Sequence, residues 1–304
     1  VTNILTHPTF VAGKCHTKFI DETPELFEFT ESRDRATRVL KYIANIQVNN
    51  PDAERHQYDT PRFPKAQREI TKQDGLKLLL DTDGPEAVKD WVLGQKKLLI
   101  TDTTMRDAHQ SLLSTRLRTR DMVKGADGTA DILADCFSLE MWGGATFDTA
   151  YRFLHESPWE RLEMLREKIP NIPFQMLLRG SNLVGYASYP DNLVRAFIAE
   201  SAREGIDVFR VFDSLNWLPN METAMAEVLR QGKFLEGTVC YTGDILDPTR
   251  DRYTLEYYAN FAKELERRGA HMLAIKDMSG LLKPYAAKKL VSTLKQEIGI
   301  PIHL

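Results

Sequence analysis

Three residues far apart in the sequence could together handle a small keto acid. They are Asp107, Arg179 and Lys276. A carboxylate is a ligand for a divalent metal, and a guanidinium can clamp a substrate carboxylate with two hydrogen bonds. A metal polarises the carbonyl, and a cationic group neutralises the enolate that develops from it. These residue types therefore suggest enolate chemistry on a keto acid.

Lys276 is the most informative of the three because it follows an apolar run, between Ile275 and Asp277. A buried lysine must be paired, neutral or chemically modified, since an isolated ammonium group is costly to remove from water. An ordinary Lys–Asp salt bridge is the structural alternative. For Arg106 and Asp107 the alternative is a mutual or cross-strand ion pair.

The elements that must position these residues repeat from residue 76 onward. Short apolar or β-branched runs alternate with longer amphipathic patterns, which indicates βα units and a mostly parallel sheet. The expected strands are 98–104, 137–144, 174–180, 208–215, 235–242, 271–276 and 301–304. The expected helices are 158–168, 190–204, 220–231, 255–268 and 284–298, with Gly205, Gly269 and Gly299 as left-handed ends. Gly125 and Gly128 should loosen the first barrel helix.

Such a sheet is either open and doubly wound or closed into a barrel. No GxGxxG or GxxxxGKS sequence follows a strand, and polar clusters follow the strands at equivalent places. A barrel gathers its active site at the carboxyl ends of its strands. We therefore predict an α/β fold, a (β/α)8 TIM barrel that is incomplete at the C-terminus in this chain.

The composition narrows the class of protein. The 304 residues carry a net charge of -3, without the basic excess typical of nucleic-acid or anionic-membrane binding. No apolar run approaches the roughly 20 residues of a membrane span, and the start lacks a signal-peptide pattern. Cys15, Cys136 and Cys240 form no CxxC pair. We expect a soluble intracellular protein with reduced thiols that binds neither nucleic acid nor a membrane.

The polar clusters, taken in order, resemble the carboxyltransferase domain of biotin-dependent pyruvate carboxylase. They are TDTTMRDAHQSLLSTR, EMWGGATFD, LLRGSNLVGY, FRVFDSLN, CYTGDI and AIKDMSGLLKP. Upstream, VTNILTHPTF through FIDETPELF resembles the tail of the biotin carboxylase domain, and SRDRATRVLKY resembles the start of the linking segment. The resemblance implies a biotin carboxylase tail at 1–30, a small α+β linker and allosteric segment at 31–75, and a truncated barrel at 76–304. An amphipathic helix is expected from Arg33 to Ile46, and a linker at 49–72.

The resemblance also implies a reaction and a site. The reaction is metal-dependent transfer of a carboxyl group from carboxybiotin to pyruvate, which forms oxaloacetate in the second half of an ATP- and bicarbonate-dependent process. The metal, Zn or Mn, would be held by Asp107 and a carbamylated Lys276, with two histidines expected after Leu304. His303 precedes that motif and is not counted among the ligands.

The remaining roles follow from the same resemblance. Arg179 and Gln110 would bind pyruvate, and Arg106 would support the enolate oxygen. Arg106, Gln110 and Lys276 are thus the catalytic candidates. Asp148 and Tyr186 would lie in the pocket that receives carboxybiotin.

The implied cofactors and partners extend beyond the barrel. They are biotin, ATP with Mg used by a domain mostly absent from this chain, the biotin carrier domain of the same polypeptide, acetyl-CoA as activator, and a homotetramer. Arg35 is an expected allosteric contact, with a plain surface charge as the alternative. The family is cytoplasmic in bacteria and lies in the mitochondrial matrix in eukaryotes.

Three other functions stay open at this point. A free-standing oxaloacetate decarboxylase or transcarboxylase subunit would share the barrel chemistry, although residues 1–50 argue against it. A metal-dependent aldol- or Claisen-type lyase or synthase would share the metal but not the WGGATFD and RGSN stretches. A non-catalytic truncated scaffold is the third.

Overall fold

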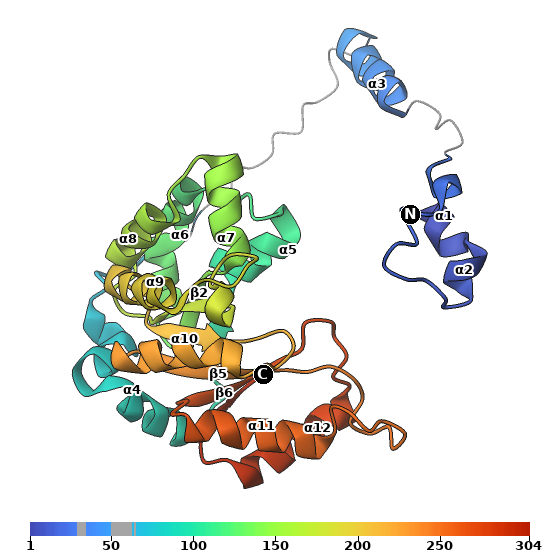
Figure 1. Cartoon of the computed structure of the whole chain (residues 1–304). Coiled ribbons are helices and arrows are strands. Elements are labelled where there is room, and N and C mark those ends of the chain that lie inside the picture. The colour runs from blue at the N-terminus through green and yellow to red at the C-terminus, as the bar shows by residue number, and fades with distance from the viewer. Residues whose placement is uncertain (29–34, 50–62, 64) are drawn as a thin grey trace. The chain divides into compact units, whose positions relative to one another are not determined.

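The computed structural model describes residues 1–28, 35–49, 63 and 65–304, in two units, Val1–Pro61 and Arg62–Leu304 (Figure 1). In the first unit, α1 (Thr2–Thr6), α2 (Pro8–Val11) and the 3-10 turn η1 (Pro24–Phe27) precede α3 (Arg35–Asn49). The predicted amphipathic helix is thus present as α3, shifted by a few residues. Most of the predicted linker lies outside the described residues, as does the side chain of Arg35. The proposed domain boundaries stay a prediction.

The second unit is built on a seven-stranded parallel sheet in the order β1-β2-β3-β4-β5-β6-β7. The strands are β1 (Thr101–Asp102), β2 (Ser138–Trp142), β3 (Phe174–Leu178), β4 (Val208–Val211), β5 (Phe234–Cys240), β6 (Met272–Lys276) and β7 (Ile302–His303). Every predicted strand is present, mostly in a shorter form. The ring of Phe137, which precedes β2, lies 6.1 Å from that of His303 on β7, so the sheet curls around an interior. The predicted partial (β/α)8 barrel is confirmed.

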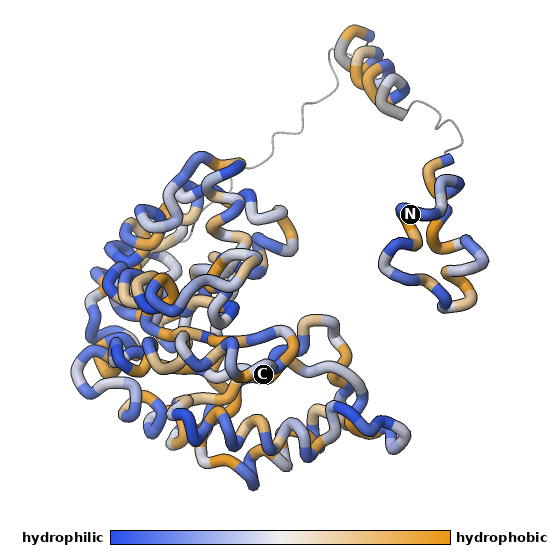
Figure 2. The backbone as a smooth tube through the Cα atoms, in the orientation of Figure 1, coloured by the Kyte–Doolittle hydropathy of each residue, from blue (hydrophilic) through white to orange (hydrophobic). Residues whose placement is uncertain are grey.

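Helices surround this curled sheet (Figure 1). They are α4 (Lys77–Leu93), α5 (His109–Leu113), α6 (Thr119–Ile132), α7 (Gly144–Thr149), α8 (Pro158–Lys168), α9 (Asp191–Glu204), α10 (Pro219–Arg230), α11 (Leu255–Arg267) and α12 (Pro284–Glu297). Hydrophilic and hydrophobic residues alternate along most of them, as amphipathic helices with one buried face require (Figure 2). The predicted helices are therefore confirmed to within a residue or two. α6 is continuous in spite of Gly125 and Gly128.

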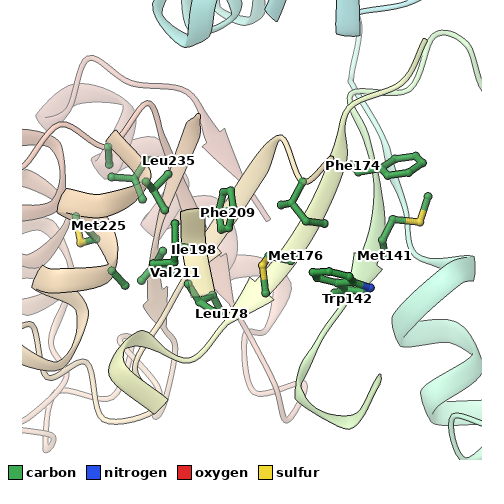
Figure 3. Packing of buried hydrophobic residues seen from close by; sticks show 14 of the residues in the cluster. Met141, Trp142, Phe174, Met176, Leu178, Ile198, Phe209, Val211, Met225 and Leu235 are labelled. Atoms are coloured by element: carbon green, nitrogen blue, oxygen red, sulfur yellow. The ribbon is translucent and has the colours of Figure 1, made fainter. Parts of the chain in front are cut away.

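The strands divide their side chains between two faces because successive residues of a strand point in opposite directions. Met176, Phe209 and Leu235, from three successive strands, belong to the large apolar cluster packed against the helices (Figure 3). A second, smaller cluster joins Leu80 and Val88 of α4 to residues at the amino ends of the strands. These strand-end residues are Phe137, Val208, Phe234 and Met272. An apolar layer with α4 thus lies at the amino-terminal end of the strands.

Asp207 ties this end of the barrel together. Its carboxylate is fully buried and lies 2.6 Å from Arg166 of α8, 3.2 Å from Lys77 at the start of α4 and 3.5 Å from Lys233 before β5. It also accepts a 2.9 Å hydrogen bond from the backbone N–H of Phe174. A buried carboxylate is tolerable only with such compensation. One residue therefore joins α4, α8 and two strands.

One predicted helix end is wrong. Gly205 and Gly269 have φ angles of +117° and +87°, as expected of left-handed ends. Gly299 does not adopt a positive φ, because Ile298, the residue that follows α12, is already in an extended conformation. The Gly299 N–H instead donates to the carboxylate of Glu266 on α11 at 2.7 Å. A contact between helices replaces the local cap.

We expect Asp207→Asn to lower the free energy of unfolding by about 3–5 kcal/mol at neutral pH, because it leaves buried cations uncompensated. Burial by itself would raise the pKa of Asp207, but Arg166, Lys77 and Lys233 hold it below its ordinary value of 3.8. The carboxylate thus stabilises the fold above that pH, and this contribution is lost as the pH falls through the lowered pKa. In urea titrations, the difference between wild type and variant should shrink in acid. Glu200→Gln, which removes an exposed partner of Arg203, is the control and should change little.

Candidate active site

The segment after β1 turns back at once as a π-helical turn, η3 (Thr104–Ala108), which continues into α5. The carboxylate of Asp102 accepts the Thr104 N–H at 3.0 Å and so begins the turn. Met105 and Arg106 are buried, whereas the Asp107 side chain is 51% exposed. The turn therefore directs Arg106 into the protein and leaves its neighbour at the surface.

Arg106 is the hub of the site. One terminal nitrogen, Nη1, donates to Asp107 at 2.8 Å and to Gln110 at 3.4 Å. The other, Nη2, donates at 2.6 Å to Glu140, a β2 residue whose side chain is 1% exposed. Charge-assisted hydrogen bonds of this length are strong in a low-dielectric setting. The mutual ion pair of Arg106 and Asp107, which the sequence left open as the structural alternative, is thus present, and it is part of a larger assembly with Gln110.

Two glycines bring Arg179 next to this hub. The register of β2 against β3 shifts between Glu140 and Trp142, and the chain then passes Gly143 and Gly144. A methyl group on Gly143 would lie 3.1 Å from Cδ of Arg106, and one on Gly144 would lie 2.8 Å from the guanidinium carbon of Arg179. Both arginines therefore pack against one stretch of backbone that has no side chains.

Arg179 follows β3 and borders a cavity of about 250 Å³. Its guanidinium donates a hydrogen bond to the carbonyl of Gly185 at 3.1 Å and lies 5.5 Å from the centre of the Tyr186 ring. Tyr186 is 78% exposed. Phe212 and Asp213, which follow β4, also line the cavity. Arg179 and Tyr186 are thus brought together.

Lys276 ends β6 on the same side of the barrel, opposite Cys240 of β5. Its Nζ lies 5.2 Å from the centre of the Phe212 ring. Burial lowers the pKa of Lys276, the neighbouring Cys240 opposes this, Arg106 and Arg210 lower the pKa further, and Asp107 again opposes the change. Within the described residues no Lys–Asp salt bridge forms at Lys276, and the carboxylate of Asp277 instead accepts the N–H groups of Leu281 and Leu282. Lys276 therefore lies near the charges of the hub, with a pKa below its ordinary value.

A second set of charges fills the interior between the apolar layer and the hub. Arg210 of β4 donates to Glu236 of β5 at 2.6 and 3.2 Å, and His303 lies 2.6 Å from the same carboxylate. Burial alone would raise the pKa of Glu236, but Arg210 and His303 lower it to about 2. His303 is thus bound to Glu236 in the interior of the barrel.

The residues expected to bind biotin and a metal stay predictions. Asp148, on α7, pairs with Arg152 at 3.2 Å, and within the described residues no contact joins it to Tyr186. The same part of the chain contains no group of three or more His, Cys, Asp or Glu side chains that could hold a metal. Asp107 and Lys276 supply a half-exposed carboxylate and an amine with a lowered pKa. These donors suit a divalent cation and would need further ligands.

Sequence comparisons agree with this geometry. No family model matches the chain. The pyruvate carboxylase of Staphylococcus aureus is 56% identical across 99% of this chain and 27% of the relative, and the mitochondrial pyruvate carboxylase of Homo sapiens is 48% identical across 99% and 26%. The chain is homologous to one contiguous part of pyruvate carboxylase. It spans about a quarter of the length of these curated relatives.

Solved structures of pyruvate carboxylase lead to the same part of the enzyme. The complete multifunctional pyruvate carboxylase from Rhizobium etli has a TM-score of 0.79 and 50% identity over 99% of this chain and 28% of that chain. Its carboxyl transferase domain with pyruvate and biocytin has a TM-score of 0.79 and 50% identity over 89% of this chain and 46% of that chain. The barrel is therefore similar to the carboxyltransferase domain of pyruvate carboxylase.

Sequence reasoning missed Glu140, Gly143 and Gly144, although all three lie in the EMWGGATFD motif. Glu140 had a readable signal, since a carboxylate within an apolar strand needs a cation. The two glycines had a weaker one, because a Gly-Gly pair after a strand is common in ordinary turns. Only the folded chain shows which side chains press against them.

Gly144→Ala should displace the guanidinium of Arg179 with little loss of stability, because the atoms within 2.9 Å of the new methyl group all belong to the end of a flexible side chain. A crystal structure of the variant should lack the 3.1 Å hydrogen bond from Arg179 to the Gly185 carbonyl. Gly94→Ala is the matched control, since its methyl group would meet no atom nearer than 3.5 Å. An unmoved Arg179 in Gly144→Ala would contradict the packing described above.

Proposed function

We propose that this chain carries out the carboxyltransferase step of a pyruvate carboxylase, in which a carboxyl group carried on biotin is transferred to pyruvate to form oxaloacetate. The observation that supports this most is the convergence of Arg106, Asp107, Gln110 and Lys276 at one end of the barrel with Arg179 beside them. Three cationic side chains, Arg106, Arg179 and Lys276, lie there and could stabilise an anionic enolate. Homology along 99% of the chain, its first 75 residues included, favours this enzyme over a free-standing barrel subunit.

Pyruvate would bind between Arg179 and the hub. Within the part of the chain that the structure describes, the guanidinium of Arg179 makes one hydrogen bond, to the Gly185 carbonyl, and this leaves further donors for a substrate carboxylate. Arg106 would support the enolate oxygen, and Gln110, held by Arg106, would help to orient the keto acid. The Gly143–Gly144 stretch lets both arginines approach the same small molecule.

Asp107 and Lys276 would hold the divalent metal, zinc or manganese, as two of its ligands. When bound, the metal would polarise the carbonyl oxygen of the keto acid. The lowered pKa of Lys276 enlarges its neutral fraction, which is the form that can add CO2 to give a carbamate, with release of a proton. A carbamate would turn the amine into an anionic oxygen ligand, which suits a hard cation better.

The cofactors and partners belong to the same proposal. Tyr186, stacked near Arg179, and Asp148 would line the entry for biotin, delivered by a carrier domain of the same polypeptide. The related Rhizobium etli domain was solved with pyruvate and biocytin, and another structure of that enzyme contains the allosteric activator acetyl coenzyme A.

The remaining proposals concern the whole enzyme. ATP with Mg would act in a biotin carboxylase domain, Arg35 would contribute to acetyl-CoA control, and the enzyme would be a homotetramer. Its compartment would be the cytoplasm of a bacterium or the mitochondrial matrix. In the described stretches, no helix is long and apolar enough to cross a membrane.

Arg179→Ala in the full-length enzyme should raise the pyruvate concentration needed for half-maximal rate by about 100-fold, the effect of losing about 3 kcal/mol from a charge-assisted pair. Bicarbonate-dependent ATP cleavage should continue, because biotin is carboxylated in another domain. Steady-state assays of both activities test this. Arg203→Ala, which removes an exposed arginine of α9, is the control. Equal loss of both activities in Arg179→Ala would refute the assignment.

Lys276→Arg should abolish carboxyl transfer and lower the metal content, because a guanidinium keeps its proton and cannot form a carbamate. Metal content of the purified full-length protein is measured by inductively coupled plasma mass spectrometry. Lys283→Arg, at an exposed lysine after the same strand, should retain the wild-type content. Wild-type metal content in Lys276→Arg would exclude Lys276 as a ligand.

A further inference from the structure

Glu140 has no role in the proposed reaction, yet it is the most buried group that contacts the hub. Its side chain is 1% exposed within β2, and Oε1 accepts from Arg106 Nη2 at 2.6 Å. Its second oxygen, Oε2, is also buried and has no hydrogen-bond partner among the described residues. A buried carboxylate with one oxygen that accepts no hydrogen bond destabilises the fold, so the presence of Glu140 at this position needs an explanation.

The geometry of Arg106 supplies one. An arginine binds a carboxylate most tightly through two parallel hydrogen bonds, which require two nitrogens on one edge of the guanidinium. Here Nη2 donates to Glu140, and Asp107 is bound through Nη1 alone, at Oδ1. The Nε atom of Arg106 is buried and has no partner within the described chain, and the Cδ atom lies against Gly143. Glu140 thus holds the guanidinium in an orientation in which Asp107 receives one hydrogen bond from it and not a parallel pair.

The charges act in the same direction. Glu140 compensates Arg106 from within the low-dielectric interior, where an ion pair is stronger than at the surface. With Glu140 neutral, Asp107 would be the remaining carboxylate bonded to Arg106. A carboxylate held more tightly by an arginine is a poorer ligand for a cation, because both compete for the same oxygen lone pairs.

We propose that Glu140 is a positioning residue that holds Arg106 so that Asp107 stays available to a divalent metal. The inference rests on the proposed function in that Asp107 is taken as a metal ligand. Glu140 would act by binding one side of the Arg106 guanidinium, so that Asp107 shares this cation with a second carboxylate.

The test uses full-length protein stripped of metal and titrated with Mn²⁺ alone, with bound and free ion measured by electron paramagnetic resonance. Glu140→Gln keeps the shape of the side chain and removes its charge, and it should weaken Mn²⁺ binding by about tenfold, as changes next to metal ligands commonly do. The double variant Glu140→Gln/Arg106→Met should recover most of this loss, because the competitor for Asp107 is gone. Unchanged affinity in the single variant, or no recovery in the double variant, would overturn the proposal.

Glu236→Gln is the matched control. It also neutralises a fully buried strand carboxylate, but its partners are Arg210 and His303, not Arg106. It should leave Mn²⁺ affinity near wild type, and a loss as large as that of Glu140→Gln would point to general damage and overturn the proposal. Should Glu140→Gln fail to fold by circular dichroism, Arg106→Met alone decides, since it should bind Mn²⁺ at least as tightly as wild type.

Asp107→Asn separates this inference from the proposed function. If Asp107→Asn leaves Mn²⁺ binding unchanged, Asp107 is not a ligand and the metal site of the proposed function fails. If Asp107→Asn weakens binding while Glu140→Gln does not, only the role of Glu140 is wrong.

Discussion

The barrel depends on the pairing of charges that its strands bury. Arg210 and Glu236 point inward from neighbouring strands, and Arg106 of the turn η3, which follows β1, meets Glu140 of β2. An unpaired charge in such an interior would cost several kcal/mol. The first pair therefore requires β4 and β5 to lie side by side with the same face inward, and the second holds the turn after β1 against β2.

Every second residue of a strand points into the barrel, so the inward side chains form three successive layers along the strands. On β5, Phe234 belongs to the apolar layer beside α4, Glu236 to the ion pairs, and Cys240 lies opposite Lys276 at the carboxyl end. The apolar layer and the ion pairs leave the reactive groups at the one end that opens to substrate. Burial there lowers the pKa of Lys276 and raises that of Cys240 to about 11, so the amine tends toward neutrality while the thiol stays protonated.

These contacts give a physical reason for one motif that the chain shares with the carboxyltransferase domain of pyruvate carboxylase. The EMWGGATFD motif supplies a buried carboxylate for one arginine and two bare backbone positions for a pair of arginines. Its sequence is thus explained by packing and charge as much as by contact with a substrate. The same contacts separate what orients the hub, Glu140, from what would touch the keto acid, Arg179 and Arg106.

The sequence by itself determined the strands, the helices and the order of motifs. Hydrophobic periodicity, helix-end residues and turn residues act on neighbouring positions of the chain, so they can be recognised without the fold. The sequence also singled out Arg106, Asp107, Arg179 and Lys276 as candidates, since charged residues directly after apolar runs stand out in a linear pattern, whereas Gln110 was named through the resemblance to the carboxyltransferase domain. Only the tertiary structure decided the partners: that Arg106 is shared between Asp107 and Glu140, that Lys276 is not paired with Asp277, and that Gly299 serves a contact with Glu266. Partner choice depends on distances across the barrel, and local sequence does not contain them.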